Sequence, residues 1–167
     1  MFFCRPHLDK KIESMASLLI LGGVLPLAVA VVAQYLLHLP PCHFCILQRW
    51  PYGFVILCGI VSLLVPRGSL RWRLAVAFGI LGFLATGLLG LVHSGIESGF
   101  LKYTGGCVAS DTVSIEAILA SPIVACDAVM AQFAGLSMAS WNVVYVVFAL
   151  ILVALQYRCD WKHHVLR

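Results

Sequence analysis

Residues 40–53 read Pro-Pro-Cys-His-Phe-Cys-Ile-Leu-Gln-Arg-Trp-Pro-Tyr-Gly, and this stretch decides how the chain is organised. Its two leading prolines end one apolar segment, and the pair Cys42 and Cys45 opens the next. Two cysteines three residues apart share a helix face, and Arg49 lies one turn further along that face. A helix N-terminus and a nearby guanidinium both favour a thiolate over a thiol. The stretch therefore predicts a redox-active cysteine pair at the mouth of an apolar helix.

The composition is that of a membrane protein. The 167 residues are 62% hydrophobic and 11% charged, with a mean hydropathy of +1.00. A helix needs about 20 apolar residues to cross a bilayer, and the chain contains enough such runs for an all-α, four-transmembrane-helix bundle in a single integral membrane domain. The first run is too long for the apolar part of a secretory signal, and no small-residue cleavage site closes it. The spans are expected at 15–37, 44–65, 74–92 and 138–157, with outer loops at 38–43 and 94–137.

Basic residues predict the orientation of this bundle. Most of them lie before the first span, between the second and third, or after the fourth: Arg5, Lys10, Lys11, Arg67, Arg71, Arg73, Arg158, Lys162 and Arg167. Because cytoplasmic loops carry an excess of Lys and Arg, both termini and the loop at 66–73 are expected in the cytoplasm. The net charge of +4 then reflects topology, and we expect no nucleic-acid partner.

On this topology the seven cysteines divide by compartment. Cys42, Cys45, Cys107 and Cys126 face the oxidising side, and their spacing suggests the pairs Cys42–Cys45 and Cys107–Cys126. The remaining three, in the cytoplasmic tails or in mid-span, are given no redox role: Cys4, Cys58 and Cys159.

Two alternatives stand beside the redox interpretation of the outer four cysteines. One is a zinc site, which is disfavoured because the second pair is widely spaced and the compartment is oxidising, so we expect no metal. The other is a pair of structural disulfides. A Cys-X-X-Cys ring is short and easily reduced, so it would add little stability to a bundle of membrane spans.

The sequence also suggests roles for several other polar and aromatic side chains. Arg49 is costly inside a span and is expected to be functional, whereas Gln34 is expected to bond to a neighbouring helix. His93, at the outer end of the third span, is either a proton donor or a simply hydrogen-bonded histidine. Trp50 and Tyr52 are expected in the aromatic belt at the membrane surface.

Small residues and an apolar stripe predict how the rest packs. Gly82, Thr86 and Gly90 recur at four-residue spacing in the third span and should allow close helix packing. In the long outer loop, apolar residues follow a helical period and predict a short helix, which lies on the membrane surface or packs on the top of the bundle. These residues are Ile115, Ile118, Leu119, Cys126, Val129, Met130, Phe133 and Leu136.

The chain resembles the disulfide bond formation protein B (DsbB) family. The resemblance rests on Cys-His-Phe-Cys-Ile-Leu-Gln-Arg-Trp-Pro-Tyr, on four spans with cytoplasmic ends, on a second outer cysteine pair, and on Gly-Leu-Ser-Met-Ala-Ser-Trp-Asn at 135–142. It implies an enzyme of the bacterial inner membrane with its redox cysteines facing the periplasm. It further implies that the enzyme reoxidises a soluble, thioredoxin-fold dithiol oxidase (DsbA-like) and passes the electrons to a membrane quinone, ubiquinone or menaquinone. Such a relay is what keeps the periplasm oxidising.

The resemblance also implies a role for each site residue. Cys107 would be attacked by the soluble partner and Cys126 would be the thiol released. Cys42 and Cys45 would then accept the electrons, with Cys45 next to the quinone. Arg49 matches the family's quinone-site arginine, and His93 lies near a family histidine and is a second candidate quinone-binding residue.

Two other functions compete with this one. A vitamin K epoxide reductase-type enzyme also links thiols to quinone, but there the Cys-X-X-Cys is expected late in the chain, after the loop pair. A non-enzymatic four-span scaffold or transporter with structural disulfides would predict polar residues near mid-membrane, and beyond Arg49 the spans offer almost none.

Overall fold

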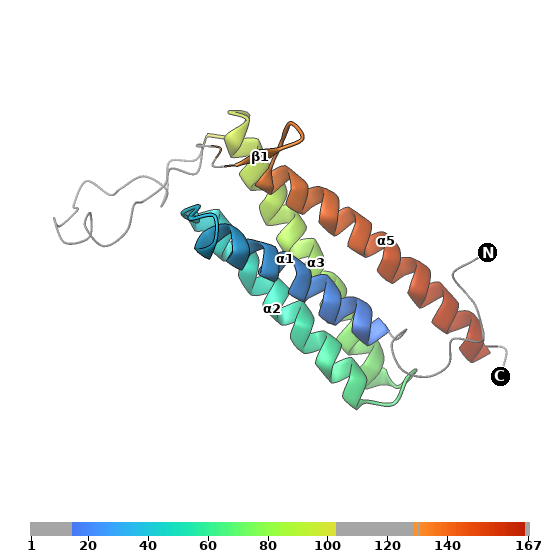
Figure 1. Cartoon of the computed structure of the whole chain (residues 1–167). Coiled ribbons are helices and arrows are strands. Elements are labelled where there is room, and N and C mark those ends of the chain that lie inside the picture. Colours follow the sequence, from blue (N-terminus) through green and yellow to red (C-terminus); the bar gives the residue numbers. More distant parts are fainter. Residues whose placement is uncertain (1–14, 103–128, 130, 166–167) are drawn as a thin grey trace.

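A computed structural model describes residues 15–102, 129 and 131–165, shown as the coloured ribbon of Figure 1. Its helices are α1 (Met15–Tyr35), α2 (His43–Leu64), α3 (Leu70–Glu97) and α5 (Met138–Val165). A two-stranded hairpin, β1 (Gln132–Phe133) and β2 (Leu136–Ser137), precedes α5. Within the described residues four helices are long and apolar enough to cross a membrane, as the sequence predicted.

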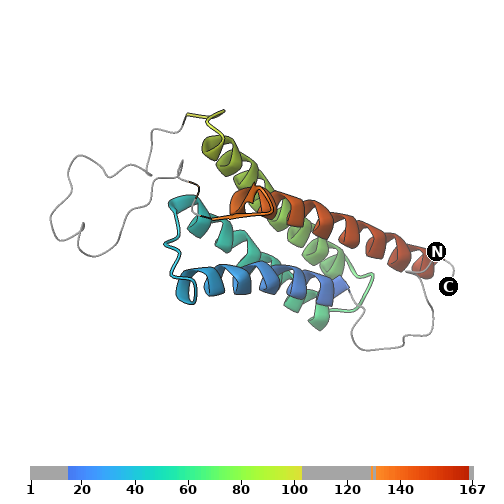
Figure 2. The same ribbon diagram turned by 45° about the horizontal axis from the view of Figure 1, so that its top comes forward.

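The helices form one bundle in which chain neighbours pack on each other. α2 contacts both α1 and α3, α3 contacts α5, and α5 also reaches α1. Figures 1 and 2 show these helices running side by side, with α5 lying along α3. The hairpin, the start of α2 and the end of α3 therefore meet at one end of the bundle, which we call the cysteine end.

The outward faces of these helices are apolar. Leu21 is 61% exposed, Leu64 79% and Leu88 64%. In water such continuous apolar faces would promote aggregation, whereas in a bilayer they match the lipid tails. The exposed faces thus support the membrane setting inferred from composition.

Small residues hold the buried faces close together, as predicted for the third span. A Cβ at Gly82 would lie 2.6 Å from Val55 Cγ2 of α2, and one at Gly90 would lie 2.8 Å from Asn142 Nδ2 of α5. Thr86 is fully buried between them. α3 thus packs tightly against both neighbours, and this packing fixes the height of its outer end relative to α2.

Helix ends differ from the predicted spans by a few residues. α3 begins at Leu70, where Ser69 Oγ accepts a hydrogen bond of 3.2 Å from the Trp72 backbone N–H, and it continues to Glu97. The expected span at 74–92 was shorter because it avoided the charges at both ends, yet charged residues are tolerated where a helix leaves the hydrocarbon. The added final turn carries His93 and Glu97 on one face.

The predicted surface helix is wrong over residues 132–137. Phe133 pairs with Leu136 in an antiparallel hairpin, and its two-residue turn, Ala134 and Gly135, has φ angles of 51° and 79°. Two consecutive residues with positive φ are the conformation of a tight hairpin turn and cannot continue a right-handed helix. The remainder of that predicted helix, before residue 129, lies outside the described residues, as do both chain termini, so the orientation stays a prediction.

Candidate functional site

Cys42 and Cys45 lie at the N-terminus of α2, where the sequence placed them. Cys42 is the N-cap, and its Sγ accepts a hydrogen bond of 3.3 Å from the Cys45 backbone N–H. The two sulfur atoms are 3.0 Å apart and belong to free thiols, so the structure describes the reduced pair. Cys42 is a buried residue and Cys45 is half-buried.

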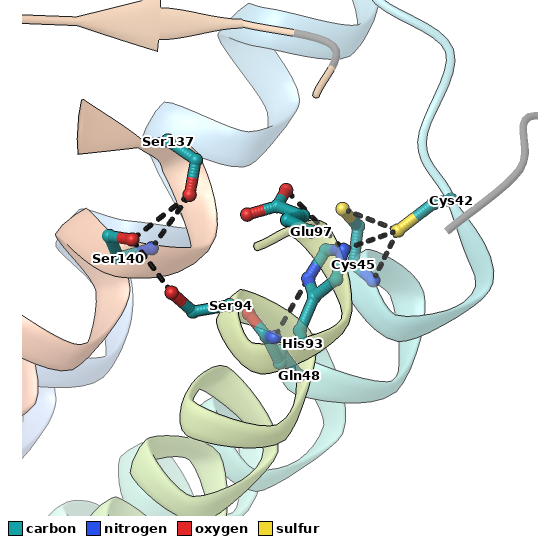
Figure 3. A network of polar contacts seen from close by, with 8 residues as sticks. All are labelled: Cys42, Cys45, Gln48, His93, Ser94, Glu97, Ser137 and Ser140. Atoms are coloured by element: carbon teal, nitrogen blue, oxygen red, sulfur yellow. Dashed lines mark hydrogen bonds and ion pairs between the residues drawn. The ribbon is translucent and has the colours of Figure 1, made fainter. Parts of the chain in front are cut away.

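His93 of α3 contacts this pair directly. Its Nε2 lies 3.4 Å from Cys42 Sγ and its Nδ1 lies 3.4 Å from Gln48 Nε2, while the ring stacks on Phe44 with centroids 5.5 Å apart. Figure 3 shows the imidazole between the cysteines and Gln48. The histidine is 3% exposed, so packing and hydrogen bonds hold its ring in place.

The surroundings stabilise the ionised form of Cys42, which precedes the spanning part of α2. The hydrogen bond from the Cys45 thiol lowers the pKa of Cys42 most, and the contact with His93 and the Cys45 backbone N–H lower it further. Burial acts in the opposite direction but does not prevail, and the pKa falls well below its usual range. A thiolate is the nucleophile in thiol–disulfide exchange, so Cys42 is prepared for that reaction.

Glu97 joins the cluster one helical turn after His93. Its Oε1 is 3.6 Å from His93 Nε2, and its side chain is only 9% exposed. The other oxygen, Oε2, is buried and has no hydrogen-bond partner among the described residues. A buried carboxylate oxygen without a partner is costly, so this group is a candidate for a ligand or a proton.

A cavity of about 460 Å³ opens beside the cysteines. It is lined mainly by apolar side chains and takes residues from all four spanning helices and the hairpin. The polar groups on its wall include both cysteines, Arg49, His93 and Glu97. Its size and lining are typical of a site for a mostly apolar molecule with a few polar atoms.

Arg49 enters this cavity on the same face as Cys45, as predicted. Its Nη1 donates a hydrogen bond of 2.7 Å to Gln34 Oε1 of α1, which confirms that Gln34 bonds across to a neighbouring helix. Its Nε is buried and has no hydrogen-bond partner within the described residues. Gln34 thus holds the guanidinium while one of its donors remains available.

The aromatic residues of the motif separate into two environments. Trp50 is 78% exposed, as a belt residue requires, but Tyr52 is 3% exposed, so the prediction of a belt position was wrong for Tyr52. Its hydroxyl donates a hydrogen bond to Asn142 Oδ1 of α5, and Asn142 Nδ2 donates to the Thr86 carbonyl at 3.2 Å. The two residues tie α2, α3 and α5 together and also line the cavity.

The predicted site residues are thus only partly brought together. Cys42, Cys45, Arg49 and His93 line one cavity. Cys107 and Cys126 lie outside the described residues, as does Cys4. Cys58 is buried against α3, where its Cβ would be 3.6 Å from a Cβ at Gly79, so its assignment as a buried mid-span cysteine is confirmed.

Three polar side chains of the site were not singled out from the sequence: Gln48, Glu97 and Asn142. Gln48 lies inside the quoted motif and is buried. Glu97 carried a usable signal, because an acidic residue ending an apolar run and lying four residues after a histidine shares its helix face. Asn142 carried a similar signal, as a polar residue in the first turn of an apolar span.

Comparisons with known proteins show the family of the chain. The family model described as disulfide bond formation protein DsbB matches residues 12–156. A Disulfide bond formation protein B 2 of Pseudomonas aeruginosa is 30% identical over 145 residues, covering 80% of this chain and 83% of that protein. A Disulfide bond formation protein B of Dechloromonas aromatica is 42% identical over 64 residues, covering 38% of this chain and 39% of that protein.

A third relative, the Disulfide bond formation protein B of Mannheimia succiniciproducens, is 26% identical over 133 residues, covering 76% of this chain and 75% of that protein. No solved structure matches the chain. The family match spans most of the sequence, including the cysteine motif, the cavity and all four membrane helices. The chain belongs to the DsbB family of disulfide bond formation proteins.

Proposed function

We propose that this protein is a protein-dithiol:quinone oxidoreductase of the bacterial inner membrane. It reoxidises a soluble, thioredoxin-fold dithiol oxidase of the DsbA type and passes the electrons to a membrane quinone. Family membership supports a role in disulfide bond formation through thiol oxidation. The observation that carries the quinone step is the cavity that Cys45 and Arg49 share among the membrane-spanning helices.

The residues of the cavity fit a quinone. Its apolar walls suit the ring and the first part of a lipid tail, and the guanidinium of Arg49, which lines the cavity, supplies a donor for a carbonyl oxygen. When bound, a quinone accepts two electrons and two protons. The cationic Arg49, held by Gln34, stabilises negative charge that develops beside it.

The cysteine pair performs the transfer from the protein side. As the Cys42–Cys45 disulfide forms, the two thiols together lose two electrons and two protons. The sulfur of the stabilised Cys42 thiolate lies 3.0 Å from Cys45 Sγ, close enough for the disulfide to close, and the electron pair that the two sulfurs lose would pass to the bound quinone. His93 Nε2 lies 3.4 Å from Cys42 Sγ and 3.6 Å from Glu97 Oε1, so it stands between that sulfur and the carboxylate. His93 and Glu97 together provide a short route for one of the two protons that leave the cysteines.

The first half of the cycle is assigned by family resemblance. The soluble partner's dithiol reduces a Cys107–Cys126 disulfide through a mixed disulfide at Cys107, and Cys126 is released as a thiol. Exchange with the Cys42–Cys45 disulfide then restores the outer pair and leaves Cys42 and Cys45 reduced. Thiols consumed and disulfides formed balance at each exchange, so the net electron flow ends on the quinone.

Quinone reduction driven by a reduced thioredoxin-fold oxidase tests the proposal. Purified wild-type protein in detergent should turn over, Cys45→Ser should not, and Cys58→Ser, which changes a thiol buried away from the cavity, should match wild type. A wild-type protein that binds the oxidase without reducing quinone would favour the scaffold alternative, in which the cysteines are structural.

A further inference from the structure

A group of soft ligand atoms lies at the cysteine end. The sulfurs of Cys42 and Cys45 and a ring nitrogen of His93 all lie within 4.8 Å of one another. Thiolate and imidazole ligands favour Zn²⁺, whereas the hard cations Mg²⁺ and Ca²⁺ prefer oxygen ligands. Figure 3 shows these groups converging from α2 and α3, with Glu97 next to them.

Glu97 supplies the independent sign that a cation belongs there. Its side chain is 91% buried, being 9% exposed, and Oε2 has no hydrogen-bond partner among the described residues. A bound cation would give this oxygen a partner and remove the repulsion between carboxylate and thiolates.

The distances suit tetrahedral coordination. With Zn–S and Zn–N or Zn–O bonds of about 2.3 and 2.1 Å, neighbouring ligand atoms are separated by roughly 3.3 to 3.8 Å. Cys42 Sγ and His93 Nε2 are 3.4 Å apart, and His93 Nε2 and Glu97 Oε1 are 3.6 Å apart. The sulfurs, at 3.0 Å, must separate by less than about 1 Å, which a small rotation of the half-buried Cys45 side chain provides. Glu97 lies outside the group of ligand atoms within 4.8 Å of one another, so its carboxylate must also turn toward the sulfurs to become the fourth ligand.

The second ring nitrogen of His93, Nδ1, also has a neighbour that can hydrogen-bond to it. If Nε2 binds a metal, Nδ1 must carry the proton and needs an acceptor. Gln48 lies 3.4 Å from Nδ1, and its amide can turn to present its oxygen there. The cluster therefore has three converging ligands, a carboxylate beside its histidine as a fourth, and a group that orients that histidine.

We propose that the reduced centre binds one Zn²⁺ through Cys42, Cys45, His93 and Glu97. Because Cys42 already favours its thiolate, the ion displaces the Cys45 thiol proton and any proton on His93 Nε2; these protons leave to solvent, and no electrons are transferred. A Cys42–Cys45 disulfide offers no thiolates, so binding occurs only in the reduced protein. This departs from the expectation of no metal and from the four-cysteine zinc site considered above, because the ligands include neither Cys107 nor Cys126.

The consequence for electron transfer rests on the proposed function. Thiolates held by Zn²⁺ cannot form a disulfide, so the ion stops quinone reduction by trapping the reduced pair. Free Zn²⁺ outside the membrane would then act as a reversible inhibitor of the enzyme.

Co²⁺ is the probe for the site, because thiolate ligation gives sulfur-to-cobalt charge-transfer absorption and tetrahedral geometry gives strong visible bands. Full-length protein in detergent is titrated in metal-free buffer, reduced and oxidised, in a Cys107→Ser/Cys126→Ser background. We expect one Co²⁺ per reduced chain, displaced by Zn²⁺, and no such spectrum after oxidation. Loss of the spectrum in this background would overturn the proposed ligand set in favour of the four-cysteine site.

Variants then test the individual ligands. Cys42→Ser should lose the charge-transfer band, and Glu97→Gln, which keeps the side-chain shape, should weaken binding at least ten-fold. Cys58→Ser is the control and should bind as the parent does. Equal affinity in Glu97→Gln and the parent, or equal binding by oxidised and reduced protein, would contradict the proposal, and the second comparison requires no substitution at the site.

Zinc inhibition separates this inference from the proposed function. In wild type, the inhibition constant of Zn²⁺ for quinone reduction should match its dissociation constant from the reduced protein. Glu97→Gln should need at least ten-fold more Zn²⁺ for the same fractional inhibition of its own zinc-free rate. Quinone reduction that zinc leaves unchanged would refute the inference alone. Metal binding without quinone reduction in metal-free buffer would refute the proposed function and leave the metal site standing.

Discussion

Cys42 shows how local backbone and a neighbouring helix act on one atom. As the N-cap of α2, its sulfur accepts the Cys45 backbone N–H and lies 3.4 Å from His93 Nε2 of α3. A cysteine at a helix start is recognisable in the sequence, whereas the histidine contact depends on how α2 and α3 align. The sequence could thus predict a low-pKa cysteine at this helix start, but it could not predict that His93 also lowers the pKa of Cys42.

The pH dependence of the Cys42 thiolate follows from that environment. Because its folded-state pKa is lowered, the thiolate should persist as the pH falls below the range where an ordinary thiol becomes protonated. The far-ultraviolet thiolate absorbance of the reduced protein, minus that of Cys42→Ser, should therefore be retained at pH 6. His93→Phe should move this titration upward. A difference signal that disappears below pH 8 in wild type would contradict the assignment.

Arg49 should affect quinone use more than any other arginine described. Losing a hydrogen bond from a charged donor costs about 1.5 to 3 kcal/mol, so Arg49→Ala should lower kcat/KM for quinone roughly ten-fold or more. Arg49→Lys should recover part of this loss, because it keeps the charge without the planar donors. Arg67→Ala, an exposed arginine in the loop between α2 and α3, is the control and should match wild type. An unchanged kcat/KM in Arg49→Ala would exclude it from the site.

At the scale of elements, close packing between α2 and α3 positions the site. A Cβ at Gly82 would meet Val55 at 2.6 Å, so Gly82→Ala forces the helices apart. Overpacking of this kind costs about 1 to 3 kcal/mol, and we expect a lower thermal midpoint in detergent. At Gly53 a Cβ meets nothing within 4 Å, so Gly53→Ala should hold or raise the midpoint. Equal midpoints for the two variants would show that this contact does not limit stability.

The hairpin before α5 shows where a periodic pattern misleads. Val129, Phe133 and Leu136 recur at helical spacing, yet Phe133 and Leu136 face each other across a turn. That turn depends on positive φ at Ala134 and Gly135, and alanine gives no sign of such a conformation. The hairpin is instead stabilised by Trp141 Nε1, which donates a hydrogen bond of 2.8 Å to the Phe133 carbonyl from the next helix.

At the scale of the whole molecule, the run lengths of apolar residues predicted four helices because a bilayer leaves few alternatives. Helices must satisfy their backbone internally and need a fixed length to cross the hydrocarbon. The contact of His93 with Cys42 and the hydrogen bond of Tyr52 with Asn142 could not be predicted in the same way. These contacts depend on the rotation and height of α3 and α5 relative to α2, which packing decides and hydropathy does not record.

The orientation in the membrane is a prediction that labelling can check. We expect the loop between α2 and α3 in the cytoplasm and the cysteine end in the periplasm. In a chain whose native cysteines are serines, Lys102→Cys should react with a membrane-impermeant maleimide on cells with a permeabilised outer membrane. Arg67→Cys should react only after the inner membrane is opened. The reverse pattern would contradict the orientation and with it the proposed periplasmic partner.

The central claim is that electrons leave the chain through Cys42 and Cys45 into a quinone at the cavity. A single-turnover experiment tests it without any partner protein: pre-reduced Cys107→Ser/Cys126→Ser chain is mixed with quinone in the absence of oxygen. We predict that each chain reduces one quinone and loses two thiols. When the same protein also carries the substitution Cys45→Ser, we predict no quinone reduction. Quinone that stays oxidised beside a fully reduced Cys42–Cys45 pair would contradict the account.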